Sequence, residues 1–219
     1  MTSPRKRVVV FISGGGSNMM ALVAAAKAQD FPADIVGVIS DKPDAGGLAK
    51  ASAEGIATFA FPRKDYTSKE AHEEAIFAAL DALSPDILCL AGYMRLLSGT
   101  FIQRYEGKMI NIHPSLLPLF PGLHTHQRAI DAGMRIAGCT VHFVTEGMDE
   151  GPVIGQAAVP VLSDDTADTL AARVLTVEHK IYPQALKLFA EGKVRMEGGK
   201  AVRTADASGN AATGAVISA

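Results

Sequence analysis

The strongest constraint on the fold of this chain is an alternation of short apolar runs with helix-forming segments. Val8–Ile12 reads VVVFI, a continuous and mostly β-branched run, and SGGGS separates it from the helix-forming segment Asn18–Gln29. A continuous apolar run suits a strand that is covered on both faces, as strands are in parallel sheets. Repetition of this unit predicts an α/β protein with a doubly wound, mostly parallel sheet.

The alternation continues through the first half of the chain. Further strands are expected at residues 34–40, 58–61, 86–92 and 108–112, and a second helix at residues 46–54. The clearest helix covers residues 67–83, where Thr67 or Ser68 can cap the first turn and Glu70 lies close to a capping-box position. Ligands of such sheets bind beyond the carboxyl ends of the strands, so the motifs at those ends are candidates for a site.

From Cys139 onward the pattern changes. The segments CTVHFVTE and PVIGQAAVPV lie close together in the sequence, which predicts two strands that pair antiparallel toward the C-terminal part of the sheet. Residues 165–191 predict a long helix with a kink at Pro183. KVRMEGGKAVR contains a Gly-Gly turn and predicts a hairpin.

Length and charge limit the class of protein. The chain has 219 residues, the length of one large domain, which we expect to span residues 1–203. Residues 204–219 are mostly Ala, Gly, Ser and Asn, and predict a mobile tail. Lys and Arg number 21 against 23 Asp and Glu, so the net charge of −2 gives no reason to expect nucleic acid or a membrane as a partner. Small molecules are the expected partners.

The N-terminal apolar run and the cysteines indicate a compartment. The run is too short for a signal peptide or a membrane span, and Cys89 and Cys139 lie in apolar stretches without CxxC spacing. We therefore expect a cytoplasmic protein whose cysteines are reduced core residues.

The SGGGSN turn lies between a strand and a helix, where backbone N–H groups and the helix dipole converge on an anion such as phosphate. The dinucleotide fingerprint requires a third glycine where this chain has Met19, and no Gly-Lys-Ser/Thr follows for a Walker motif. A purely structural turn therefore stays open. Asp41 keeps a dinucleotide-binding alternative, because an acid at the end of the second strand can hold a ribose. We favour an ordinary turn there, since the acid begins DKPDAGG.

The segment MINIHP places two polar side chains at the end of an apolar strand. Strand side chains alternate, so Asn111 and His113 leave the strand on the same side. An amide and an imidazole together can hold a carbonyl oxygen as it becomes an oxyanion, and the imidazole can also move a proton. Prolines at 114, 118 and 121 stiffen the following loop, which favours a site over simple packing of the histidine.

A second polar loop follows the next strand. MDEGP places Asp149 on a loop between two strands, where catalytic groups often lie, and a carboxylate beside His113 would favour the imidazolium and orient it. The spacing of these two residues does not establish that contact. We expect Glu150, the competing acid, to be solvated.

The remaining histidines are weaker candidates. His124 and His126 have the spacing of a metal pair, but no third ligand stands nearby in sequence, so substrate contact or a place at a helix start is expected instead. His142 can face the site from its strand, His72 is expected to be solvated on a helix, and His179 lies in the long helix.

Several motifs occur in one order along the chain: SGGGSN, AGYMRLL, NIHPSLLP, PGLHTH, VHFVTEGMDEGPVI and ARVLTVEHKIYP. From about Arg7 to Arg203 the sequence resembles the phosphoribosylglycinamide formyltransferases of de novo purine synthesis. NIHPSLLP marks the wider folate-dependent formyltransferase group. The glycine turn, PGLHTH and EHKIYP narrow the resemblance to the enzymes that act on glycinamide ribonucleotide. The resemblance implies a Rossmann-like formyltransferase fold and transfer of a formyl group from 10-formyltetrahydrofolate to the amine of glycinamide ribonucleotide. It requires no metal and leaves a homodimer open.

The resemblance also implies roles for individual residues. His113 would be the proton donor, Asn111 its partner at the formyl oxygen, and Asp149 the group that favours the imidazolium. The substrate phosphate and ribose would be bound by Gly16, Ser17, Asn18 and Glu178. The reduced folate would be bound by Lys69, Met94, Arg95, Leu96, Leu97, Asn111, Thr145, Glu146, Gly147, Met148 and Asp149.

Two positions depart from the family pattern. Relatives usually carry Asn at the position of Gly15 and often Arg at the position of Lys69. Lysine keeps the positive charge there but loses the bidentate geometry of arginine.

Four other functions stay open. A methionyl-tRNA formyltransferase would add an RNA-binding domain and a basic surface, and a formyltetrahydrofolate deformylase would add an amino-terminal regulatory domain. We expect neither addition here. A nicotinamide-dependent oxidoreductase would rest on the glycine turn and Asp41 alone, and a phosphometabolite sensor on the anion site alone.

Overall fold

The apolar runs of the first half form strands in the computed structural model, which describes residues 4–204. These strands are β1 Lys6–Ile12, β2 Ala33–Ser40, β3 Ala57–Ala60, β4 Ile87–Leu90 and β5 Met109–His113. They lie in the order β3-β2-β1-β4-β5, and every neighbouring pair is parallel. The predicted parallel sheet is therefore confirmed.

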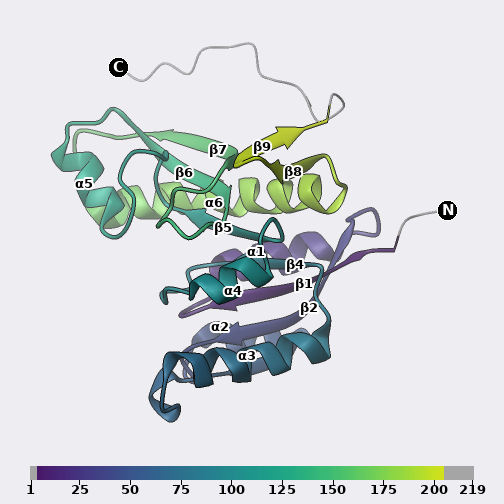
Figure 1. The fold of residues 1–219 in the computed structure, drawn as a ribbon. Helices are drawn as coiled ribbons and strands as arrows, with labels where there is room; N and C mark the ends of the chain where they lie inside the picture. Colours follow the sequence, from purple (N-terminus) through teal and green to yellow (C-terminus); the bar gives the residue numbers. More distant parts are fainter. Residues whose placement is uncertain (1–3, 205–219) are drawn as a thin grey trace. The chain divides into compact units, whose positions relative to one another are not determined.

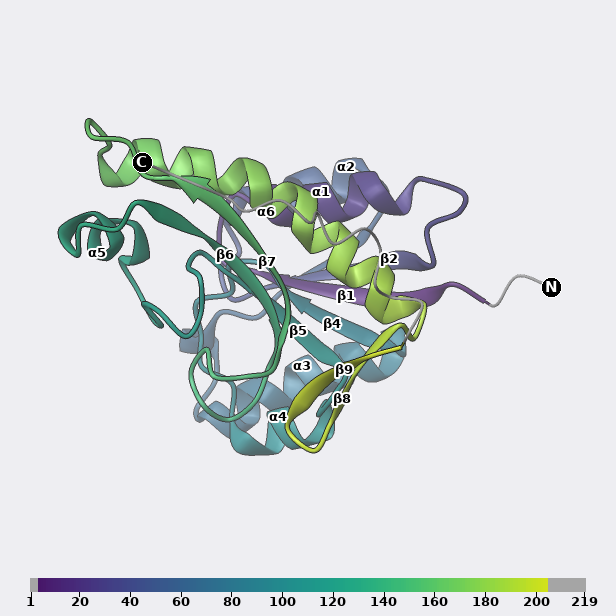
Figure 2. The same ribbon diagram turned by 90° about the horizontal axis from the view of Figure 1, so that it is seen from above.

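Helices cover both faces of these strands. They are α1 Ser17–Ala26, α2 Gly46–Ala53, the 3-10 helix η1 Arg63–Asp65, α3 Lys69–Leu83 and α4 Gly99–Arg104. Figure 2 shows α1 and α2 on one side of β1, β2 and β4, with α3 and α4 on the other side. This arrangement is the predicted doubly wound one, although the short helix α4 was not expected from the sequence.

The described residues divide into two compact units, with the boundary between Asn111 and Ile112. The first unit holds the parallel strands, and β5 continues from it into the second. In the second unit, β6 Ile136–Phe143 and β7 Val153–Pro160 pair antiparallel, as predicted. The single domain expected over residues 1–203 stays a prediction, and the expected tail lies outside the described residues from position 205 onward.

The second unit is organised around one long helix. It contains α5 Thr125–Asp131, α6 Ala167–Ala190 and the predicted hairpin, formed by β8 Val194–Glu197 and β9 Lys200–Arg203. Helix α6 runs alongside β6 and β7 in both ribbon views and also contacts β8 (Figures 1 and 2). It begins with a capping box between Thr166 and Thr169 and includes Pro183 within its span. Its buried apolar side chains are Leu170, Val174, Tyr182, Ala185, Leu186 and Ala190.

The apolar core explains why these segments fold as they do. All five side chains of Val8–Ile12 have no exposed surface, as expected for a strand covered on both faces. Cys89 and Cys139 are both buried and neither forms a disulfide, which confirms that they are reduced core residues. Among the described residues, no helix combines the length and the apolar character needed to cross a membrane.

The start of α3 confirms one prediction and corrects another. Ser68 caps the helix, because its hydroxyl accepts a hydrogen bond from the Ala71 N–H at 3.1 Å. His72, which we expected to be solvated, is only 3% exposed. Its Nε2 lies 2.8 Å from the Phe61 carbonyl oxygen, and its ring meets the edge of Tyr66. His72 shares a helical face with the buried Ile76, four residues on, and that face packs inward.

Candidate active site

The end of β5 presents the two polar residues that the sequence singled out. Asn111 pairs in register with Leu90 of β4 and is half-buried. His113 is the last residue of the strand and is 6% exposed. Both side chains are therefore fixed by a strand rather than by a loop, which suits groups that must keep a working geometry.

An acceptor faces each ring nitrogen of His113. Its Nδ1 lies 3.3 Å from Asp149 Oδ2, and its Nε2 lies 3.1 Å from the Phe120 carbonyl oxygen. A carbonyl oxygen and an ionised carboxylate only accept hydrogen bonds, so the imidazolium, which donates from both nitrogens, satisfies both contacts. The contact between His113 and Asp149, which spacing could not establish, is present.

The loop that carries Asp149 is strained and tightly held. Asp149 has φ 57°, in the left-handed region, which costs a residue with a side chain more than it costs glycine. Its Oδ2 accepts a second hydrogen bond from the Gly122 N–H at 2.8 Å. At Gly151, an added Cβ would lie 1.7 Å from the Phe143 carbonyl oxygen, so only glycine allows this approach. Backbone strain that the surroundings hold in place is typical of functional sites.

A second imidazole lies on the other side of the same carboxylate. His142 Nε2 is 3.9 Å from Asp149 Oδ1, and its Nδ1 donates to the Phe143 carbonyl oxygen at 2.8 Å. Burial lowers the pKa of His142 more than the Phe143 carbonyl and Asp149 raise it, so this ring is neutral at pH 7. The prediction that His142 faces the site is confirmed, and Glu150 is exposed as expected.

The proline loop is anchored to β6 and β7 by two polar side chains that sequence reasoning missed. The Thr140 hydroxyl donates to the Ser115 carbonyl at 2.6 Å and accepts from the Leu117 N–H at 3.0 Å. Gln156 Nε2 donates to the Leu117 carbonyl oxygen at 2.8 Å. The only signal in the sequence was a polar residue, Thr140 or Gln156, inside each of two mostly apolar strands. These bonds fix the loop that supplies the Phe120 carbonyl to His113.

A cleft of about 360 Å³ opens beside this group. Its lining residues are Leu117, Pro118, Pro121, Asp149, Glu150, Gly151 and Val153. His124 stands at the start of α5 with φ 57°, and burial lowers the pKa of His126, with a smaller contribution from His113. Within the described part of the chain, no group of His, Cys, Asp and Glu side chains has the arrangement of a metal site.

The glycine turn of the first unit has the geometry of an anion site. Gly16 precedes α1 with φ 69°, and no side-chain cap stands at the start of the helix, where backbone N–H groups and the helix dipole favour an anion. The turn is fixed from outside, because Gly47 N–H donates to the Gly14 carbonyl at 3.0 Å and Lys50 Nζ to the Gly15 carbonyl at 2.8 Å. Its role in phosphate binding stays a prediction.

The first unit also contains a cleft of about 450 Å³. Its lining residues are Arg63, Lys69, His72, Glu73, Ile76, Tyr93, Met94, Arg95, Leu96 and Leu97. Five of the residues expected to bind folate thus come together, while Thr145, Glu146, Gly147 and Met148 belong to the second unit. The cleft also includes Arg63 and Tyr93, to which the sequence analysis gave no role, although Tyr93 directly precedes Met94 in AGYMRLL.

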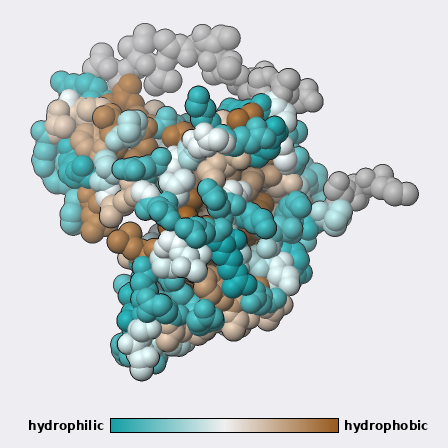
Figure 3. Space-filling model, viewed as in Figure 1, coloured by the Kyte–Doolittle hydropathy of each residue, from teal (hydrophilic) through white to brown (hydrophobic). Residues whose placement is uncertain are grey.

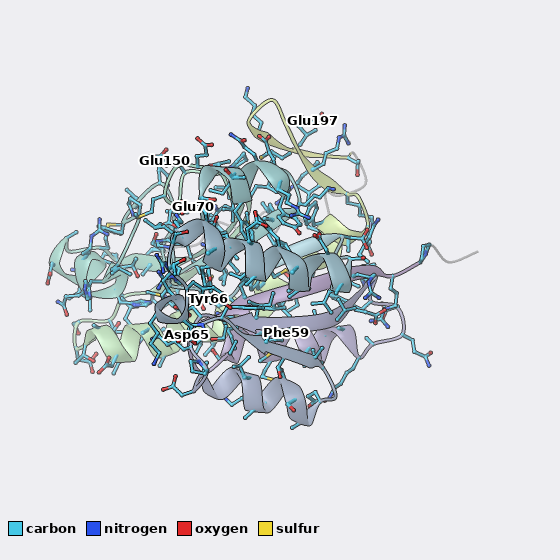
Figure 4. The ribbon with its side chains drawn as sticks, turned by 60° about the horizontal axis from the view of Figure 1, so that its bottom comes forward. Phe59, Asp65, Tyr66, Glu70, Glu150 and Glu197 are labelled. Atoms are coloured by element: carbon cyan, nitrogen blue, oxygen red, sulfur yellow. The ribbon has the colours of Figure 1, made fainter. Side chains whose placement is uncertain are left out.

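The segment that leads into α3 is polar. Figure 4 shows Asp65 and Tyr66 just ahead of Glu70, which lies on the first turn of the helix. In Figure 3 the end of the first unit where α3 begins is mostly teal and white. This segment meets the cleft through Arg63 and Lys69, two of its cationic lining residues.

Comparisons with known proteins identify the family of the chain. A model of the family described as Formyl transferase matches residues 6–186. The phosphoribosylglycinamide formyltransferase of Escherichia coli K12 is 46% identical over 189 residues, which cover 86% of this chain and 89% of that protein. The chain belongs to the formyl transferase family, among its phosphoribosylglycinamide formyltransferases. The family predicted from the motifs is therefore confirmed.

Solved structures of family members show the same fold. The phosphoribosylglycinamide formyltransferase of Brucella melitensis is 65% identical, with a TM-score of 0.85, and the match covers 98% of this chain and all of that one. A formyltetrahydrofolate deformylase from Pseudomonas syringae also has a TM-score of 0.85, but is 27% identical and is covered over only 67% of its length. The trifunctional purine biosynthetic protein of Bos taurus is 50% identical over 194 residues, and this chain spans 19% of its length.

Proposed function

We propose that the protein transfers the formyl group of 10-formyltetrahydrofolate to the amine of 5-phosphoribosylglycinamide, a reaction of purine biosynthesis. The observation that carries this proposal is the His113 imidazole, which is held between Asp149 and the Phe120 carbonyl with an acceptor facing each nitrogen. The family supports the reaction, since several members are named for it. The geometry supports acid catalysis by an imidazolium.

In this reaction the amine nitrogen attacks the formyl carbon directly, without a covalent enzyme intermediate. His113 stabilises the negative charge that develops on the formyl oxygen and acts as general acid, and the Asn111 amide donates to the same oxygen. The new carbon–nitrogen bond forms first and gives a tetrahedral oxyanion. When this oxyanion collapses, the carbonyl forms again and the bond to the folate nitrogen breaks. Fixed donors of this kind are strongest where water is excluded, and His113 is 6% exposed.

The proton of the amine must reach the departing folate nitrogen. Asp149 Oδ2 is engaged by His113 and Gly122, whereas Oδ1 faces His142 at 3.9 Å, beyond hydrogen-bond distance. Because His142 is neutral and donates from Nδ1 to Phe143, Oδ1 keeps the capacity to accept from a water molecule. We assign to Asp149 both the orientation of His113 and the transfer of this proton through water.

Binding of the two substrates is assigned to groups of suited chemistry. The phosphate is assigned to the backbone N–H groups of Gly16, Ser17 and Asn18, and the ribose to Glu178, which is 6% exposed. Apolar side chains for the folate rings and cations for its carboxylates both line the cleft of the first unit. The residues assigned to folate are Lys69, Met94, Arg95, Leu96, Leu97, Asn111, Thr145, Glu146, Gly147, Met148 and Asp149.

The test mixes the protein with 10-formyltetrahydrofolate, with and without glycinamide ribonucleotide, and follows the folate absorbance. We expect consumption of the folate only when the acceptor is present. Equal consumption without the acceptor would indicate a deformylase, and the proposal would be withdrawn. His113→Ala is expected to remove most turnover, whereas binding of the phosphorylated substrate survives. Near-normal turnover in that variant would overturn the assigned role of His113.

A further inference from the structure

Ser13, the residue that follows β1, joins three loops of the first unit through its own hydrogen bonds. Its N–H donates to the Gly92 carbonyl at 3.1 Å, and its hydroxyl accepts from the Met94 N–H at 2.8 Å. The same hydroxyl donates to Asp41 Oδ1 at 2.5 Å. Ser13 is 4% exposed, so these bonds lie away from bulk water. One buried residue thus connects the chain ends that follow β1, β2 and β4.

The path of the chain after β4 explains why this hydroxyl is needed. The pairing of β4 with β1 continues to Ala91, whose N–H donates to the Phe11 carbonyl at 2.8 Å. The chain then turns at Gly92, which has φ 75°. The rings of Tyr93 and Phe11 pack edge to face, with their centroids 5.3 Å apart. The turn directs the Met94 N–H inward, where a backbone donor without an acceptor costs about 1–3 kcal/mol. The Ser13 hydroxyl is the acceptor.

Asp41 fixes the direction of that hydroxyl. A serine hydroxyl has one proton and two lone pairs, and it rotates to suit its partners. When the proton points at Asp41 Oδ1, a lone pair remains for the Met94 N–H. The acid that the sequence offered as a ribose ligand therefore has a partner within the protein.

We propose that Ser13 and Asp41 are positioning residues that set the backbone of Met94–Leu97 for the reduced folate. This inference rests on the proposed function, since four of the residues assigned to folate lie on this segment. Met94 and Leu96 are 60% and 70% exposed, so their side chains do little to fix the segment. The Met94 N–H bond to Ser13 holds its first residue in place.

Ser40 provides a matched control. It also lies at the carboxyl end of a parallel strand, has no exposed surface, and its hydroxyl accepts from the Lys42 N–H at 3.0 Å. It contacts the chain after β2 rather than Met94–Leu97. Loss of a buried hydroxyl that only stabilises the fold should therefore have the same effect at Ser40 and Ser13.

The experiment compares Ser13→Ala, Ser40→Ala, Asp41→Ala and Asp41→Asn by melting temperature, kcat and KM for each substrate. We expect Ser13→Ala and Asp41→Ala to raise the KM for 10-formyltetrahydrofolate about fivefold, the equivalent of one hydrogen bond. Ser40→Ala should leave that KM unchanged while lowering the melting temperature to a similar extent. Asp41→Asn keeps an oxygen that accepts from Ser13, so its KM should stay within about twofold of wild type.

The outcomes separate the two levels of the argument. An unchanged folate KM in both Ser13→Ala and Asp41→Ala, with wild-type turnover intact, would overturn the positioning role and leave the proposed function standing. Equal rises in Ser13→Ala and Ser40→Ala would reduce Ser13 to a structural residue. No turnover in the wild-type protein with both substrates would remove the proposed function and this inference together. If Ser13→Ala does not fold, the pair of Asp41 variants decides.

Discussion

The glycine turn of the first unit and the Asp149 loop of the second both place a residue in the left-handed region, but they use different residues. Gly16 has φ 69° and Asp149 has φ 57°. At the turn the backbone itself is the proposed binding group, so glycine meets the conformation without strain. At the loop a side chain is needed, so the strain is accepted and offset by the bond from the Gly122 N–H. The comparison separates binding by backbone from chemistry by side chain.

The largest effect should follow from the side chain of Asp149. Asn tolerates the left-handed region and keeps the shape of the acid, so Asp149→Asn removes the charge and leaves the loop folded. We expect kcat to fall about 100-fold or more, because the imidazolium of His113 loses its partner. Steady-state kinetics measure this. Glu150→Gln changes the neighbouring exposed acid and should keep kcat near wild type; equal losses in both variants would contradict the assignment.

The glycine turn should be sensitive to an added side chain rather than to a change of charge. In Gly16→Ala the new Cβ would lie 2.9 Å from the Gly47 Cα at a positive φ, so we expect the free energy of unfolding to fall by about 1–3 kcal/mol. The KM for the phosphorylated substrate should rise as the turn shifts. Gly15→Ala meets nothing within 4 Å and serves as the control. Urea denaturation and kinetics check both, and matching behaviour of the two variants would refute the backbone role.

Buried histidines should make the stability of the second unit depend on pH. Burial lowers the pKa of His142 in the folded protein from an ordinary value of 6.5. The unfolded chain therefore binds the proton first, and stability present above pH 6.5 falls as the pH drops toward the folded value. The slope from this residue is at most about 1.4 kcal/mol per pH unit.

Denaturation of wild-type protein and His142→Gln between pH 7.5 and 5, approximately the window set by this lowered pKa, measures that slope. The variant should show the shallower loss of stability on acidification. Identical slopes would mean that His142 does not carry the effect. His126 and His179, whose pKa values are also lowered by burial, should account for part of the slope that remains.

The smallest effect is expected at Lys69, in the cleft of the first unit. Its ammonium is one of several cations there, so Lys69→Met should raise the KM for 10-formyltetrahydrofolate by no more than about fivefold and leave kcat alone. Lys69→Arg should differ little from wild type. High salt should reduce the difference between Lys69→Met and wild type, and a loss of kcat would place this side chain closer to the reaction than we propose.

Local pattern predicted most of the fold and two of the three residues of the candidate catalytic group. Hydrophobic periodicity predicted the strands and placed Asn111 and His113 on the same side of one strand. Both predictions depend only on residues that are neighbours in sequence. The contact with Asp149 is long-range and came from the family resemblance rather than from spacing. Ser13 and Thr140 were missed because a single buried hydroxyl at or within an apolar strand leaves no repeat to detect. The prediction that His72 is solvated was wrong, because it relied on the polarity of histidine and not on the position of this residue on the inward face of α3.

Gly151 carries a consequence for how this sequence can vary. Its Cβ position is filled by the Phe143 carbonyl, although no side chain at 151 takes part in any reaction step. In a library of variants selected for growth without supplied purines, we expect position 151 to accept only glycine, as strictly as a catalytic position would. A list of tolerated substitutions would then single out a residue that contributes only by having no side chain, which leaves room for the Phe143 carbonyl.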